Sequence, residues 1–194
     1  MDGPDRREKD LCERAWTQDG FFTAEQAMAL GFTGEDVVAA VAAGTWAQPE
    51  PGLFRLAPWR STDLEDVARC CVRLDDAVVS HQSAAELHGF GHLHPRFLHV
   101  TSTATATSRL DRVAVHHSAM PPGDCEHTGA FRITTPLRTV FDLADGGVSQ
   151  WVLDEVVGDA FAIGRLDRDA LESAAVGRSE RVERRVKRAL SAWE

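Results

Sequence analysis

An α+β protein is predicted by the sequence, with a winged helix-turn-helix head over residues 1–58 and an α/β body over residues 59–194. Two observations lead to this prediction. Three short segments with helix start and stop signals precede a hairpin-like segment, which is the element order of a winged helix. Beyond Pro58, short runs that resemble β-strands alternate with amphipathic segments, which predicts a small sheet. Toward the C-terminus the apolar residues recur at helical spacing without further strand-like runs, which predicts a helical C-terminus.

The three helices of the head are predicted from local signals. Residues 1–17 combine charged side chains with apolar residues at helical spacing, which predicts a first helix. Thr23 precedes a second helix, and Gln26 lies three residues later, which is the spacing of a capping box. Thr33 opens a third helix, and Gly44 ends it.

A hairpin closes the head. Residues 46–47 and 53–56 are mostly apolar and flank the turn sequence QPEPG, so we expect two short strands that form a β-wing. Three helices followed by a hairpin favour the winged helix-turn-helix. Another small helical module with a hairpin would have the same element order, and this alternative stays open.

The body is expected to combine a small sheet with several helices. Residues 62–65 are expected to cap a helix that runs to about Leu74, and Ser80 to cap a short helix that ends at Gly89. Strands are expected at residues 98–101, 113–116 and 131–134. Pro136 favours a first helical turn, and the segments WVLDEVVGDAFAIG, DRDALESAAV and SERVERRVKRALSAW predict further helices.

Apolar spacing assigns an inward face to the main body helices. The expected inward residues are Ala84, Ala85, Leu87, Leu137, Val140, Phe141, Leu143, Val182, Val186 and Leu190. Arg138 and Asp142 lie four residues apart, so we expect them to pair with each other on the outer side of their helix. Substitution of an inward residue by aspartate is expected to unfold the body.

The charge distribution argues against DNA binding by the head. The formal net charge is −9, and no Lys or Arg occurs between Arg14 and Arg55. The expected recognition helix, residues 34–44, has Glu35 and Asp36 in its first turn and no Arg, Lys, Asn or Gln. Those missing side chains are the ones that usually contact phosphates and read bases, so we expect weak DNA binding by the head.

Several features favour a cytoplasmic protein. No stretch approaches the roughly 20 apolar residues that a membrane span needs. The N-terminal segment MDGPDRREKD is charged and is not followed by the apolar run of a signal peptide. The four cysteines form no CxxC pair, so we expect buried, reduced thiols; they are Cys12, Cys70, Cys71 and Cys125.

The histidines do not predict a metal site or a catalytic site. All eight lie between His81 and His127, with a cluster in the segment HGFGHLH and a pair at His116 and His117. No HExxH or cysteine-based spacing accompanies them, so we expect no metal and no cofactor. Ser80 precedes His81, but the segment has no GxSxG elbow, and we expect no enzymatic activity.

Five segments resemble those of the AbiEi antitoxin family, in the same order: PEPGLFRLAP, VVSHQSAAELHGF, LHVT, VAVHHS and ITTPLRTVFDLA. The resemblance covers roughly residues 20–145, and SHQSAAELHG and TTPLRTVFDLA are its more specific parts. It implies an N-terminal winged helix that binds the protein's own promoter and a C-terminal domain that neutralises an AbiEii-like nucleotidyltransferase toxin. The recognition helix of the family is commonly rich in arginine, and this chain departs from that pattern.

Arginines near the two ends of the chain are the candidate contacts to nucleic acid or to a protein partner. They are Arg6, Arg7, Arg14, Arg181, Arg184, Arg185 and Arg188. The terminal segment also fits an ordinary solvated helix, since Glu180 and Glu183 offset part of its charge. A stand-alone DNA-binding repressor is the alternative function. The mode of toxin neutralisation, the oligomeric state and the target of the toxin stay open.

Overall fold

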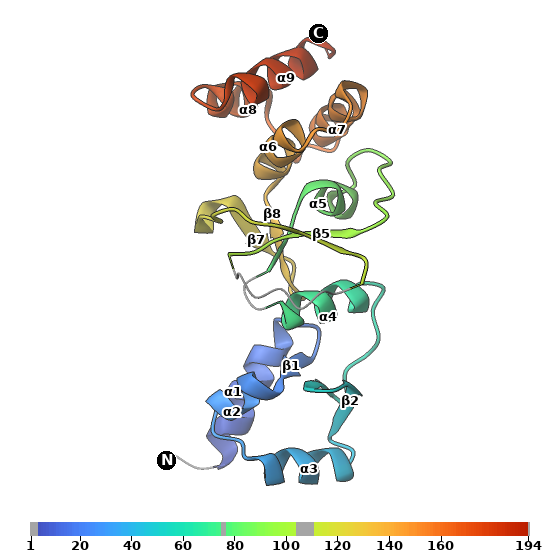
Figure 1. Cartoon of the computed structure of the whole chain (residues 1–194), viewed down its shortest axis with the longest axis vertical. Helices are drawn as coiled ribbons and strands as arrows, with labels where there is room; N and C mark the ends of the chain where they lie inside the picture. The colour runs from blue at the N-terminus through green and yellow to red at the C-terminus, as the bar shows by residue number, and fades with distance from the viewer. Residues whose placement is uncertain (1–3, 75–76, 104–110, 194) are drawn as a thin grey trace. The chain divides into compact units, whose positions relative to one another are not determined.

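The computed structural model describes residues 4–74, 77–103 and 111–193 (Figure 1). The fold is α+β, as predicted. Internal contacts divide the chain into two compact units, Met1–Asp76 with His127–Phe131, and Ala77–Glu126 with Arg132–Glu194. Part of the stretch between the second and third predicted strands, residues 104–110, lies outside the described residues.

The first unit contains the helices and the hairpin expected of the head, together with an additional strand. Its elements are α1 (Pro4–Trp16), β1 (Phe21–Thr23), α2 (Ala24–Ala29), α3 (Gly34–Ala42), β2 (Trp46–Glu50), β3 (Leu53–Leu56) and α4 (Glu65–Arg73). The sheet is antiparallel with the order β1–β3–β2. Sequence analysis did not predict β1, because three residues are too few for a period-two pattern to show.

Capping boxes set the starts of α2 and α3. The Thr23 hydroxyl accepts a hydrogen bond from the Gln26 backbone N–H, and the Gln26 side chain accepts one from the Thr23 backbone, which confirms the predicted box. Thr33 and Asp36 form the same arrangement at α3. Each box satisfies two backbone N–H groups that would otherwise lack a partner at the helix start.

The predicted start of α4 is wrong. Leu64 occupies the cap position of α4 and provides no side-chain hydrogen bond. The Thr62 hydroxyl instead donates to Asp19 Oδ2 at 3.1 Å, and the Ser61 hydroxyl donates to Glu65. The Thr62 hydroxyl, which lies in the segment that local sequence assigned to capping, therefore binds a carboxylate that lies far away in the sequence.

A buried charge network attaches the segment after β3 to the sheet of the first unit. Asp19 is buried and accepts hydrogen bonds from Arg55 at 3.0 Å and from the Trp59 indole at 3.0 Å. Arg55 also donates to Glu65 at 2.8 Å. These bonds explain why contacts group residues 59–74 with the head, whereas the sequence assigned them to the body; the functional division at residue 58 stays a prediction.

The second unit has a five-stranded sheet followed by helices. Its elements are β4 (Val78–Val79), α5 (His81–His88), β5 (Leu98–Thr101), β6 (Val113–His116), the 3₁₀ turn η1 (Pro122–Asp124), β7 (Cys125–His127), β8 (Arg132–Thr134), α6 (Pro136–Gly146), α7 (Gln150–Ala162), α8 (Arg168–Ala175) and α9 (Glu180–Ser191). The strand order is β6–β5–β4–β8–β7. The β4–β5 pair is antiparallel, and the β4–β8 and β5–β6 pairs are parallel.

Helices α5 to α9 build the largest apolar core. Val182, Val186 and Leu190 lie buried along α9, as predicted, and this face packs on α6, α7 and α8 (Figure 1). The predicted inward position of Leu87 is wrong, because its side chain is 38% exposed. The α5 residues that are buried are Ser83, Ala84 and Ala85.

The prediction that Arg138 and Asp142 pair on the outer side of their helix is wrong in its location. The two side chains form an ion pair with an Nε–Oδ1 distance of 2.7 Å, but they are only 10% and 9% exposed. Arg138 also donates to Asp124 Oδ2 at 2.8 Å, from the η1 turn. A segment distant in sequence therefore covers a pair that helical spacing alone places in solvent.

None of the described helices combines the length and the apolar character needed to cross a membrane.

Candidate functional site

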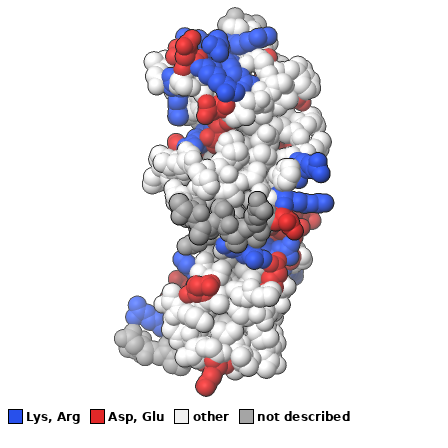
Figure 2. Space-filling view, in the orientation of Figure 1, with Lys and Arg blue, Asp and Glu red and all other residues white. Residues whose placement is uncertain are grey.

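The outer face of α9 brings three of the predicted contact arginines together. Ser179 caps the helix by accepting a hydrogen bond from the Val182 backbone N–H. Arg181, Arg184 and Arg188 follow at positions i, i+3 and i+7, a spacing that places them on one face. All three are exposed, and Figure 2 shows Lys and Arg gathered, with some acidic side chains, at the end of the second unit that carries α8 and α9.

These three guanidinium groups are available for contact. Among the residues that the structure describes, Arg184 has a long ion pair to Glu180 at 3.6 Å, in which both side chains are largely exposed. Neither Arg181 nor Arg188 makes a side-chain hydrogen bond or ion pair to a described residue. An exposed pair of this kind stabilises the fold by well under about 1 kcal/mol, so it gives way readily to a partner.

Arg185 has a different role from its neighbour Arg184. Its guanidinium donates to the Ala144 carbonyl at 2.7 Å and to the Val148 carbonyl, and its Nε donates to the Gln150 side chain at 3.3 Å. These carbonyls lie at and beyond the end of α6, where backbone acceptors lack intrahelical partners. Burial lowers the pKa of Arg185, and the charge of Arg181 adds to this effect. Arg185 therefore fastens α9 to α6.

The structure does not bring the three arginines of α1 into a shared basic surface. Arg7 forms a two-bond ion pair with Asp36 of α3, at 2.9 and 3.1 Å, and also donates to the Gly31 carbonyl. Arg6 pairs with Asp10 at 3.9 Å, and Arg14 is exposed. Hydrogen bonds from Thr33 and from Arg7 lower the pKa of Asp36 to about 2. Arg7 therefore holds α1 against α3 through its ion pair with Asp36.

The exposed surface of α3 is acidic and apolar. Glu35, Val38, Ala39 and Ala42 are its exposed side chains past the first residue, and Val38 is 70% exposed. Residues 1–76 contain 15 acidic and 8 basic side chains, a formal charge of −7, whereas residues 77–194 contain 15 and 13, a formal charge of −2. Weak DNA binding by the head stays a prediction, and both observations agree with it.

A second polar feature is a group of three histidines in the second unit. The rings of His81 and His116 stack with centroids 3.6 Å apart, and His99 Nδ1 lies 2.9 Å from His116 Nε2. Burial lowers the pKa of all three, that of His81 to about 3, where His116 and His99 contribute further. Strands β5 and β6 are parallel, with Thr101 opposite His116, and this register brings His99 and His116 close together. The register could not be predicted from the sequence.

His81 and His116 border a cavity of about 680 Å³ that Arg138, Asp142 and Arg178 also line. Asp142 Oδ2 is buried and has no hydrogen-bond partner among the described residues, and burial raises the pKa of Asp142 although Arg138 opposes this. No group of three His, Cys, Asp or Glu side chains among the described residues has an arrangement that would hold a metal ion. His81 and His116 meet through their ring faces, not through converging lone pairs.

The Ser80–His81 contact does not resemble an accessible nucleophile and base. His81 Nδ1 lies 2.9 Å from Ser80 Oγ, but Ser80 is fully buried and also accepts a hydrogen bond from the Thr101 hydroxyl. A nucleophile needs an open approach to its substrate, and this hydroxyl has none. The contact is therefore part of the packing between α5 and the sheet.

Comparison with known proteins identifies the family. A model of the AbiEi antitoxin C-terminal domain matches residues 77–192, which is more than half of the chain and includes the whole of α9. The structure is similar to that of the RV2827C protein from Mycobacterium tuberculosis, with a TM-score of 0.53 and 14% identity over 97% of this chain and 77% of that chain. That identity supports a common fold alone. No curated protein matches the chain. The chain belongs to the AbiEi antitoxins, a non-enzymatic family.

Proposed function

We propose that this antitoxin neutralises a cognate AbiEii-like nucleotidyltransferase toxin by binding it through the second unit. The matched domain covers residues 77–192 and includes the exposed arginine face of α9. That face is the observation on which the proposal rests. Arg181, Arg184 and Arg188 are exposed on a helix whose other side is fixed in the apolar core, so the three charges stand on a rigid support.

The chemistry of the three side chains favours an acidic partner surface. Guanidinium groups form two parallel hydrogen bonds with carboxylates and tolerate partial desolvation better than ammonium groups do. A nucleotidyltransferase needs carboxylates to hold a divalent cation against the phosphates of its substrate. We therefore propose that the arginine face binds the acidic rim of the toxin's active site and blocks it.

We propose that the head is a winged helix that serves as a protein-contact module. Its element order α1–β1–α2–α3–β2–β3 supports the winged-helix assignment. Its Arg7 and Arg55 are engaged by internal carboxylates, and α3 offers no basic side chain. A stand-alone repressor is therefore the weaker alternative, and autoregulation of the promoter would require basic groups outside α3. We expect the protein to act in the cytoplasm.

Co-expression with the cognate nucleotidyltransferase toxin tests the proposal. We expect the full chain to restore growth of cells that produce the toxin and to co-purify with it. Growth rescue without co-purification would contradict direct binding, and failure to rescue would contradict the antitoxin assignment to this toxin.

A further inference from the structure

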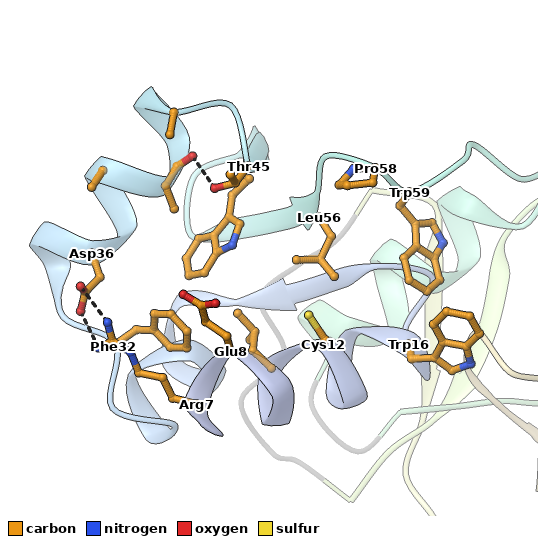
Figure 3. A pocket seen from close by; sticks show the side chains of 15 residues that line it. Arg7, Glu8, Cys12, Trp16, Phe32, Asp36, Thr45, Leu56, Pro58 and Trp59 are labelled. Carbon is orange, nitrogen blue, oxygen red and sulfur yellow. Dashed lines mark hydrogen bonds and ion pairs between the residues drawn. The ribbon is translucent and has the colours of Figure 1, made fainter. Parts of the chain in front are cut away.

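The first unit contains an apolar groove that lies outside the arginine face proposed to bind the toxin. The groove has a volume of about 800 Å³ and lies between α1, α3 and the β2–β3 hairpin (Figure 3). Ala39 and Ala40 of α3 and Ala43, which follows the end of that helix, form one wall, and their short side chains leave the space open. Pockets that bind small organic ligands have volumes of about 300 to 1,000 Å³, and this groove lies within that range.

Aromatic rings form much of the remaining lining. Trp46 and Phe32 pack together with ring centroids 5.2 Å apart, and Trp16 and Trp59 meet edge to face, also at 5.2 Å. Trp16 is 69% exposed although it borders an apolar space. Figure 3 shows Leu56 between the two ring groups along the groove. Trp46 and Phe32 are each only 7% exposed, and the Arg7 guanidinium lies over the Phe32 ring. The aromatic surface that the groove offers to a ligand therefore comes mainly from Trp16 and Trp59.

Three charged side chains line the groove, and two of them pair with each other. Arg7 and Asp36 neutralise each other through their ion pair. Glu8 is the third charged residue of the lining, and Figure 3 shows its carboxylate directed into the groove. Among the described residues no cationic side chain pairs with Glu8. The lining thus has a formal charge of −1 in an aromatic surrounding.

We propose that this groove binds a small aromatic molecule with a single positive charge. The face of an indole ring attracts cations, and an apolar cation loses little hydration on entering an aromatic site. The Glu8 carboxylate then supplies the matching charge. A ligand with a single positive charge matches the formal charge of −1 of the lining. The alanine wall leaves room for the rings of the ligand, and it has no side-chain hydrogen-bond donors that would favour an anion.

Two probes of equal shape and opposite charge test the proposal on the full chain. Tetraphenylphosphonium is the cation, tetraphenylborate is the anion, and isothermal titration calorimetry measures both dissociation constants. We expect the cation to bind at least about tenfold more tightly than the anion. Equal affinities, stronger binding of the anion, or no binding of the cation would overturn the proposal.

Three variants locate the site. Glu8→Gln should weaken cation binding about five- to tenfold, and Ala39→Phe, which fills the wall at an exposed helical position, should abolish it. Glu13→Gln is the matched control, because Glu13 lies on the same helix, pairs with Lys9 at 3.6 Å and does not line the groove. Unchanged binding by Glu8→Gln or Ala39→Phe would contradict the assignment of the site.

The alternative occupant of the groove is a second copy of this chain. Sedimentation velocity of the same proteins detects self-association. If the wild type is a dimer that Ala39→Phe converts to a monomer, and the cation does not bind, the groove is an interface between two copies and the small-molecule proposal is wrong.

Discussion

The two units of this antitoxin differ in whether exposed arginines gather on one face of a helix. In the first unit, Arg7 and Arg55 face inward and pair with Asp36, Asp19 and Glu65. In the second unit, Arg138 and Arg185 also face inward, but Arg181, Arg184 and Arg188 stay outside on α9. The first unit therefore has no basic face on its proposed recognition helix, whereas the second has one on a rigid helix.

This difference separates charge that holds the fold together from charge that is available to a partner. Adjacent Arg184 and Arg185 are the clearest case, because the first is exposed and the second binds carbonyls at and beyond the end of α6. The number of basic residues in a segment therefore says little about binding. The acceptors within reach of each guanidinium decide whether it is available.

Among the arginine variants, the largest effect on stability is expected where an inward arginine neutralises a buried carboxylate. Arg138→Ala leaves Asp142, which is 9% exposed, without its cation and should lower the free energy of unfolding by about 3 to 5 kcal/mol. Urea denaturation followed by circular dichroism measures this change. The control Arg184→Ala should change stability by less than about 0.5 kcal/mol, and equal losses for both variants would break the distinction between inward and outward arginines.

A somewhat smaller effect is expected in the first unit. Arg55→Ala removes the donor that binds the Asp19 and Glu65 carboxylates and should cost about 2 to 3 kcal/mol, because Asp19 keeps its bonds from Trp59 and Thr62. Differential scanning calorimetry of the transition of this unit gives the loss. The exposed Arg60→Ala should melt as the wild type does. If Arg55→Ala has the same transition temperature as the wild type, the charge network is not the physical reason that residues 59–74 group with the head.

Acid should weaken the second unit more than the first through their histidines. The first unit contains His127 as its one histidine by sequence, whereas His81, His99 and His116 of the second have lowered pKa values. The unfolded chain takes up protons near pH 6.5, but the folded chain holds His81 neutral down to about 3, so stability falls as the pH falls through this interval.

The size of this acid effect is at most about 1.4 kcal/mol per pH unit for His81, reduced by its partial exposure. Urea denaturation between pH 7 and pH 4 measures the slope of the free energy of unfolding against pH, and this slope should be shallower for His81→Asn than for the wild type. Asparagine is the chosen replacement because it tolerates the positive φ of 53° at this position. His92→Asn is the control, because Glu155 raises the pKa of the exposed His92. An unchanged slope for His81→Asn would show that the histidine group does not set the acid sensitivity.

The smallest effect is expected for Leu87→Asp. This side chain is partly exposed, so an aspartate there stays hydrated and should cost no more than about 1 kcal/mol. Phe141→Asp places a carboxylate in the core and should unfold the second unit. Thermal melts of the two variants compare them directly, and unfolding by Leu87→Asp would restore the inward position that sequence spacing predicted.

Local sequence signals predicted the elements that local chemistry determines. The Thr23 capping box, the start of α6 at Pro136 and the apolar stripe of α9 all depend on residues within one or two turns, and the structure confirms them. Residues 78–79 and 125–127 were not predicted as strands. They form β4 and β7 only because neighbouring strands pair with them, and segments this short have no visible period.

The direction of polar side chains could not be predicted from the same signals. Arg138 and Asp142 were correctly paired, but their burial depends on Asp124, which is distant in sequence. The Thr62 hydroxyl was assigned to a helix cap and instead binds Asp19. In each case a tertiary contact competes with a local one, and only the fold decides which is formed.

The central claim is that the exposed arginines of α9 bind the toxin, and the affinity of the purified chain for its cognate toxin tests it most directly. Isothermal titration calorimetry compares the wild type with the triple variant Arg181→Gln, Arg184→Gln and Arg188→Gln. Lys187→Gln is the control, since Lys187 lies on the same helix, three residues after Arg184, but its charge is engaged in an ion pair with Glu183 at 2.7 Å. We predict that the triple variant stays folded and binds about a hundredfold more weakly, while the control changes less than about threefold. Wild-type affinity of the folded triple variant would contradict the account.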